Sequence, residues 1–185
     1  MKRNPSYDEF YSQILETYQL HDRLQMFRWL KEIGEEVFEI MTKLGYTTKY
    51  SYEDLVKDAV VFKLDFEVEN YLGITFLTSD DRTFILINNA IKQVSLEMSV
   101  IAHEITHALQ PLEILETGAM KFERENEYLV LNEAEIQAHT VQHIYDKGIY
   151  RKEEWWLHPE LWEEAVKIKL SKLNGITIDN SNAFD

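Results

Sequence analysis

Residues 99–109 read SVIAHEITHAL, and the fold that we expect follows from this stretch. Its apolar side chains recur at the three- and four-residue spacing of a buried helix face. His103 and His107 are four residues apart, so both imidazoles leave one side of such a helix, one turn apart. Because Pro111 disfavours helical geometry in the residue before it, this motif helix should end near Gln110.

Two imidazoles one turn apart can bind a single zinc ion through nitrogen atoms at about 2.0–2.1 Å. Glu104 lies about 100° around the helix from His103, so it would stand beside the ion rather than on it. There its carboxylate can accept a proton from an attacking water, which is the role of a general base. The alternative interpretation is an exposed helix face that carries an ordinary pair of histidines. We predict a zinc site with His103 and His107 as ligands and Glu104 as the catalytic base.

A catalytic zinc site needs a third protein ligand and one open position. The chain contains no cysteine, so the third ligand has to be His, Asp or Glu. A helix predicted from Asn132 to Gly148 offers Glu133 and Glu135, which lie about 200° apart and cannot both face the ion. We prefer Glu135, because it flanks the apolar seam of that helix in line with His139, and we keep Glu133 as the alternative. We expect His139 to be a hydrogen-bond partner of the site or a donor to the developing oxyanion.

The chain before the motif helix changes from helical to strand-like periodicity. Helices are predicted over residues 8–20, 22–44 and 51–60, the last capped by Ser51. Alternation over residues 62–68 then predicts a half-buried strand, and β-rich runs at 72–78 and 83–88 predict a hairpin. We therefore expect an α+β fold, mainly helical, with a small antiparallel sheet before the motif helix.

Ser95 is the predicted N-cap of the motif helix. Residues 112–131 should be irregular or weakly helical, and a last helix should run from Pro159 to about Leu173. Because no linker divides the chain, we expect one domain over residues 1–185. Its three parts are a helical part at about 7–60, the sheet and active-site helices at about 61–148, and a C-terminal helix and tail at about 149–185.

The chain is acidic, with 19 Lys+Arg against 33 Asp+Glu and a net charge of −14. Such a charge repels a phosphate backbone, so we expect no direct nucleic acid binding, and a basic protein is the more compatible partner. We expect no membrane span, because no apolar stretch approaches about 18 residues. Residues 1–10 lead into no apolar segment, so we expect no secretory signal. With the absence of cysteine, these features predict a soluble cytoplasmic protein.

Three segments resemble the ImmA/IrrE family of zincin metallopeptidases: FILINN at 84–89, SVIAHEITHAL at 99–109 and EIQAH at 135–139. The resemblance covers about residues 71–145. In that family a strand precedes an Ala-His-Glu-x-x-His helix, and a later Glu-x-x-Ala-Asn/Asp helix supplies the third ligand. The resemblance thus also implies Glu135 as a ligand, although His139 stands where the family has Asn or Asp. It further implies cleavage of a regulatory protein, typically a repressor, and a basic DNA-binding target would suit the acidic chain.

We predict a zinc-dependent endopeptidase in which His139 or Tyr128 stabilises the oxyanion. The extended substrate should pair with an edge strand within residues 83–88. One alternative is a non-catalytic zincin-like module that sequesters a partner protein. Another is a metal-free interaction protein that uses an aromatic cluster as its surface. The tryptophans of this cluster are Trp155, Trp156 and Trp162.

Overall fold

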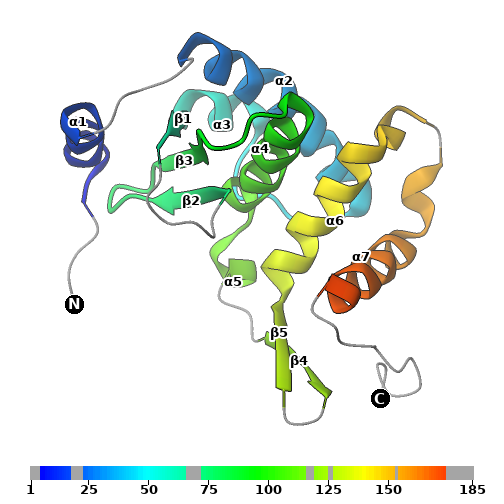
Figure 1. Ribbon diagram of the computed structural model, residues 1–185. Helices are drawn as coiled ribbons and strands as arrows, with labels where there is room; N and C mark the ends of the chain where they lie inside the picture. Colours follow the sequence, from blue (N-terminus) through cyan, green and yellow to red (C-terminus); the bar gives the residue numbers. More distant parts are fainter. Residues whose placement is uncertain are drawn as a thin grey trace.

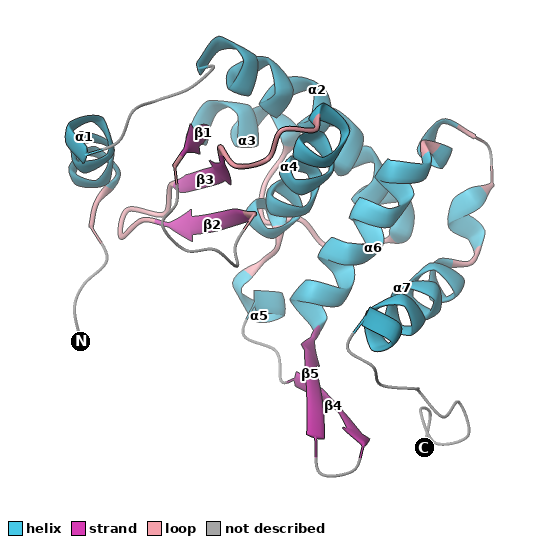
Figure 2. Cartoon of the chain, viewed as in Figure 1, coloured by secondary structure: helices cyan, strands magenta, loops and turns pink. Residues whose placement is uncertain are grey.

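The computed structural model describes residues 5–17, 23–65, 72–115, 119–124, 127–152 and 154–173. These residues form a mainly helical α+β fold with small sheets (Figures 1 and 2), which confirms the predicted fold class. The helices are α1 (Tyr7–Thr17), α2 (Arg23–Leu44), α3 (Tyr52–Asp58), α4 (Val94–Leu109), α5 (Leu112–Leu115), α6 (Glu133–Lys147) and α7 (Pro159–Leu173). The strands are β1 (Ala59–Leu64), β2 (Gly73–Leu77), β3 (Thr83–Asn88), β4 (Ala119–Arg124) and β5 (Glu127–Asn132). Two short 3₁₀ helices, η1 (Ile149–Arg151) and η2 (Trp155–Leu157), lie between α6 and α7.

The main sheet has the strand order β1-β3-β2, with β3 in the middle. β2 and β3 form the predicted antiparallel hairpin, in which Gly73 pairs with Ile87. β1 runs parallel to β3, with Ala59 opposite Thr83, so the sheet is mixed and not wholly antiparallel as predicted. The uninterrupted apolar run of β3 suits a central strand that is buried on both faces and pairs with a neighbour at each edge. β2 occupies one of these edges. β1 therefore takes the other side of β3.

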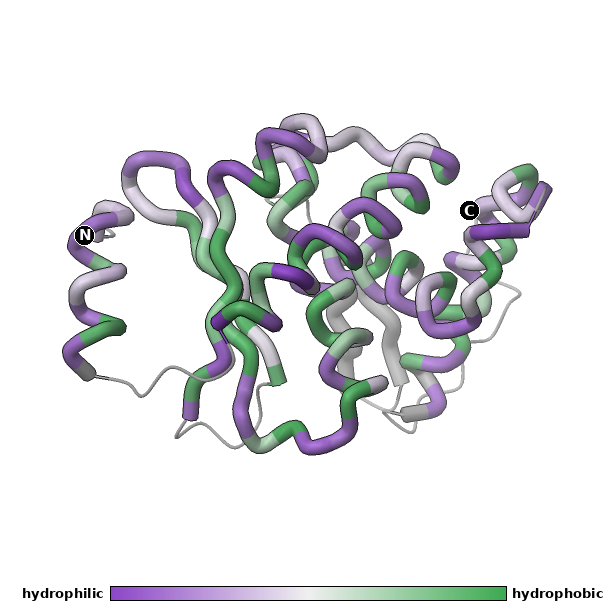
Figure 3. Tube along the Cα trace, turned by 90° about the horizontal axis from the view of Figure 1, so that it is seen from above, coloured by the Kyte–Doolittle hydropathy of each residue, from purple (hydrophilic) through white to green (hydrophobic). Residues whose placement is uncertain are grey.

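The two faces of this sheet carry separate hydrophobic clusters. On one face, Val61 and Ile85 join a core that α2, α4 and α6 complete. On the other face, α1 packs Ile14 against Phe62 and Phe84. β1 is therefore buried on both sides and not half-buried as predicted, while Phe66 and Val68 of that prediction lie outside the described residues. Figure 3 shows hydrophobic residues along the strands, and hydrophobic and hydrophilic residues alternating along the helices.

Local signals place most helix ends correctly. Ser51 caps α3 by accepting a hydrogen bond from the Asp54 backbone N–H, and Asn132 caps α6 in the same way. Gly148 ends α6 in the left-handed conformation, at φ 60°, and α7 begins at Pro159. The predicted Ser95 cap is wrong, because the N-cap of α4 is Gln93, two residues earlier, and Gln93 forms no side-chain cap hydrogen bond.

The segment predicted to be irregular, residues 112–131, contains α5 and the β4–β5 hairpin. The two strands are antiparallel, with Ala119 opposite Asn132, and they extend away from the helices (Figure 1). β5 leads directly into α6, so the hairpin ends where the second predicted site helix begins. None of the helices in the described part of the chain combines the length and apolar character that a membrane crossing requires.

Candidate metal centre

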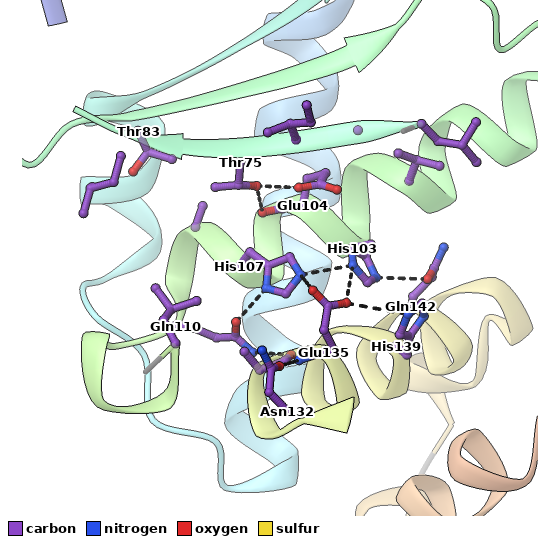
Figure 4. Close-up of a pocket in the computed structure, with 18 of the residues that line it drawn as sticks. Thr75, Thr83, His103, Glu104, His107, Gln110, Asn132, Glu135, His139 and Gln142 are labelled. Carbon is purple, nitrogen blue, oxygen red and sulfur yellow. Dashed lines mark hydrogen bonds and ion pairs between the residues drawn. The ribbon is translucent and has the colours of Figure 1, made fainter. Parts of the chain in front are cut away.

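The packing of α4 against α6 brings two histidines and one carboxylate together (Figure 4). His103 and His107 lie on α4 with their Nε2 atoms 3.1 Å apart. Glu135, in the first turn of α6, places Oε1 at 3.2 Å from His107 Nε2 and Oε2 at 3.5 Å from His103 Nε2. Three groups predicted from two distant segments therefore meet at one point.

The distances between these three donors suit a single metal ion. In a tetrahedral centre with bonds of about 2.0–2.1 Å, neighbouring ligand atoms are about 3.3 Å apart. The observed separations of 3.1, 3.2 and 3.5 Å lie on either side of that value. Without a metal ion, protons hold such a group together, since both histidines donate hydrogen bonds to Glu135, and a metal ion can take the place of those protons. The donor types and their spacing are therefore those of a group that can hold a metal ion.

His139 is a third imidazole at the same point. Its Nε2 atom lies 3.7 Å from Glu135 Oε2, and its ring centroid is 4.5 Å from that of His103. His103, Glu135 and His139 together are close enough to hold a metal ion. Burial, with the charge of His103, lowers the pKa of His139 to about 4, so its imidazole is neutral near pH 7. A neutral imidazole offers either a lone pair to a metal or an N–H to a substrate oxygen.

The protein holds Glu135 as a carboxylate. Hydrogen bonds from His103 and then from His107 lower the pKa of Glu135, and they outweigh its partial burial. For His107, burial lowers the pKa, but the hydrogen bond and charge of Glu135 prevail and the net pKa is raised. The side chains of both histidines are 13% exposed and that of Glu135 is 43% exposed, so the group opens to solvent on the Glu135 side.

Glu104 lies on α4 beneath the edge strand β2. The Thr75 hydroxyl donates to Glu104 Oε2 at 2.6 Å and also approaches the Glu104 carbonyl oxygen at 2.9 Å. The Glu104 side chain is buried, and it lines the same cleft as the histidines without belonging to the donor group. Its role as a catalytic base stays a prediction. Thr75 was not predicted, because its contact depends on how β2 crosses α4.

Two glutamines contact the Nδ1 atoms of His103 and His107. Gln142 Oε1 lies 3.2 Å from His103 Nδ1, and Gln110 Oε1 lies 2.8 Å from His107 Nδ1. Neither contact was predicted. Gln110 was expected only as the end of a helix, and no local pattern on α6 indicates that Gln142 reaches a histidine on α4.

The site opens into a cleft of about 610 Å³ between β2, α4 and α6. One wall is strand β2, from Gly73 to Leu77. Within the described residues, β2 pairs on one side only, so its outer edge faces away from the sheet. The prediction that residues 83–88 form the docking edge is wrong, because β3 is the central strand. The continuous apolar run of β3 is typical of a strand in the middle of a sheet, and it could have indicated this position.

The alternative ligand Glu133 and the tryptophans do not belong to this group of donors. Glu133 accepts a hydrogen bond from Gln137 Nε2 at 3.3 Å and does not line the cleft, whereas Glu135 does. Tyr128 lies in β5, where its side chain is outside the described part of the structure. Trp155 and Trp162 pack against the core, and each indole N–H donates to a backbone carbonyl. Structural packing therefore accounts for most of the tryptophan cluster.

Comparisons of the chain with protein-family models, with curated proteins and with solved structures found no match. Any function therefore has to be argued from the chemistry of the site itself.

Proposed function

We propose that the chain is a zinc-dependent endopeptidase of the ImmA/IrrE type, with His103, His107 and Glu135 as the metal ligands. The observation that carries this proposal is the group of three donors within 3.5 Å of one another, beside a carboxylate that is not a donor. Two nitrogens and one carboxylate oxygen form a ligand set typical of catalytic zinc. Bound there, zinc would supply Lewis-acid chemistry, which polarises a peptide carbonyl and acidifies water.

In this proposal Glu104 is the general base. Its carboxylate accepts a proton from the attacking water and later passes that proton to the leaving amine. The 2.6 Å hydrogen bond from Thr75 holds Glu104 Oε2 against β2, which leaves Oε1 to take the proton. His139, neutral near pH 7, donates a hydrogen bond to the oxyanion that develops on the substrate.

The cleft suits an extended peptide. Backbone groups on the outer edge of β2 can pair with a substrate strand, and this pairing would draw the peptide past Glu104 and the histidines. A net charge of −14 favours encounter with a basic polypeptide, and a DNA-binding regulator is one such partner.

The test combines metal analysis with a cleavage assay on a library of unstructured basic peptides. Wild-type protein should bind one zinc per chain, and His103→Ala and Glu135→Ala should each lose it. Glu104→Gln should keep its zinc and cleave at least about 10³-fold more slowly, because the carboxamide cannot accept the proton. Wild-type protein that binds no zinc, or a Glu104→Gln variant that still cleaves, would refute the proposal.

His139 gives a second candidate function some support. If His139 joined His103, His107 and Glu135 as a fourth ligand, no position would remain for water, and the chain would be a zincin-like module that sequesters a partner. In that case His139→Ala should weaken zinc binding by about 10-fold or more, and wild-type protein should cleave nothing. For the endopeptidase, the same variant should keep its zinc and lose cleavage.

A further inference from the structure

Gln142 and Gln110 connect the two helices that carry the donors. Gln142 lies on α6 and reaches His103 and Ser99 on α4. Gln110 follows α4 and reaches His107 on that helix and the Ala134 carbonyl on α6. Each amide oxygen contacts a histidine Nδ1, so each glutamine acts on the ring nitrogen opposite the candidate metal.

The hydrogen bonds through Gln142 can run in one direction only. The Asp146 carboxylate can only accept, so the Ser99 hydroxyl donates to it at 3.0 Å. Ser99 Oγ therefore accepts from Gln142 Nε2 at 2.9 Å, which leaves Gln142 Oε1 facing His103 Nδ1. Because that oxygen can only accept, His103 Nδ1 has to carry a hydrogen, and in the neutral ring Nε2 then keeps its lone pair.

The hydrogen bonds through Gln110 lead to the same result for the other histidine. The Ala134 carbonyl oxygen can only accept, and it accepts a hydrogen bond from Gln110 Nε2 at 2.8 Å. Gln110 Oε1 therefore faces His107 Nδ1 at 2.8 Å, and this nitrogen too has to carry its hydrogen. Gln110 is 1% exposed, so water cannot readily replace these partners.

We propose that Gln142 and Gln110 are positioning residues that hold the neutral rings of His103 and His107 in the Nδ1–H tautomer, so that Nε2 of each ring is the nitrogen left to bind a metal ion beside Glu135. The inference rests on the metal site of the proposed function. A histidine in the other tautomer would present an N–H to the ion and could not bind it. Both acceptors are neutral amides, so they orient the rings without adding negative charge to the site.

Gln142 allows the sharper test, because it is less buried than Gln110 and two substitutions separate hydrogen bonding from packing. Gln142→Met keeps a similar volume but accepts no hydrogen bond, and it should weaken zinc binding by about 10–100-fold. Gln142→Glu keeps an acceptor oxygen toward His103 Nδ1, and it should restore at least the wild-type affinity. Equal affinity for zinc in wild type, Gln142→Met and Gln142→Glu would overturn the inference.

A second measurement needs no metal. Long-range ¹H–¹⁵N spectra of metal-free protein at alkaline pH, where imidazoles are neutral, report which ring nitrogen carries the hydrogen. Wild-type protein should show the Nδ1–H form for His103 and His107, and Gln142→Met should lose it for His103 alone. An Nε2–H form for either ring in the wild type would refute the proposed role, whatever the zinc affinity.

The exposed Gln93 supplies the matched control, since Gln93→Met makes the same chemical change at the start of α4 without touching a histidine. It should leave both tautomers and the zinc affinity unchanged. If wild-type protein shows both Nδ1–H forms yet binds no zinc, the proposed function fails while the positioning role stands. If it binds zinc and the Gln142 variants behave alike, only the positioning role fails.

Discussion

Gly73 is the residue at which the edge strand comes closest to the motif helix. A β-carbon at this position would lie 2.8 Å from Glu104 Cγ and 2.9 Å from Val100 Cγ1. Contacts that short force neighbouring atoms apart, so only glycine lets β2 rest directly on the side chain of Glu104. The hydrogen bond between Thr75 and Glu104 depends on this close approach.

We expect Gly73→Ala to destabilise the protein by about 1–3 kcal/mol, because the new methyl group overpacks this contact. It should also slow cleavage of any peptide that the wild type cuts, since Glu104 has to move, while zinc content stays unchanged. Thermal unfolding, metal analysis and a cleavage assay measure the three effects.

Gly34→Ala is the control, because its β-carbon would lie 3.3 Å from Leu55 Cδ2 and 3.5 Å from Tyr52 Cε2, and no contact would be shorter than these. Alanine is also favoured over glycine inside a helix by about 1 kcal/mol, so this variant should be close to neutral. A Gly73→Ala protein with wild-type stability and cleavage would contradict the packing argument.

At the scale of elements, the start of α6 determines where Glu135 lies. β5 ends at Asn132, and the Asn132 side chain accepts the Glu135 backbone N–H at 2.8 Å. This cap begins the helix and orients the first turn in which the carboxylate stands. One side chain therefore links the β4–β5 hairpin, the helix and the candidate metal ligand.

Asn132→Ala should cost about 1 kcal/mol of unfolding free energy and should also weaken zinc binding. Ser51→Ala is the matched control, because Ser51 caps α3 through the Asp54 N–H at 3.2 Å, away from the donors. It should cost a similar free energy and leave zinc affinity unchanged. Urea unfolding and zinc titration of both variants test the comparison, and equal zinc affinity in the two would argue against a role for the Asn132 cap in the site.

At the scale of the whole molecule, the donors join two helices that belong to one core. α4 and α6 both contact α2, and α4 also contacts β2 and β3. An ion held by side chains from α4 and α6 opposes their separation, and it binds only the folded chain. Metal binding should therefore stabilise the entire described fold and not the cleft alone.

Free zinc at about 100 times its dissociation constant should raise the free energy of unfolding by about 2.7 kcal/mol. Calorimetry with increasing zinc measures the shift, and chelation should reverse it. His103→Ala should show little of this stabilisation. A wild-type protein whose unfolding temperature does not respond to zinc would count against the metal site.

Tyr46 joins the region after α2 to α7 through a hydrogen bond of 2.6 Å to Glu163 Oε1. Burial, followed by the hydrogen bond to Glu163, raises the pKa of Tyr46 above its ordinary value of 10.0. The folded state thus keeps a proton that the unfolded chain releases. The resulting stability is complete below about pH 10 and is lost as the pH rises above that value.

Tyr46→Phe removes this titration. It should lower stability by about 1 kcal/mol near pH 7, where the hydrogen bond is lost, and it should reduce the fall in stability above about pH 10. Urea unfolding of both proteins from neutral to alkaline pH provides the measurement. Parallel curves above pH 10 would mean that Tyr46 does not hold its proton in the folded state.

The sequence by itself determined the features that depend on neighbours along the chain. The 3.6-residue period of a helix was enough to predict that His103 and His107 share a face with Glu104 beside them. Ser51, Asn132 and Gly148 marked helix ends because capping acts over three or four residues. The α+β class followed from the same periodicities.

Only the tertiary structure decided the features that join distant segments. The packing of β2 on α4 gave Glu104 its contact with Thr75, and the order of the strands made β2 the edge. The packing of α4 on α6 gave the histidines their glutamine partners. Contacts of this kind depend on the angle and register between packed elements, which many residues determine together. No single local motif carries that information.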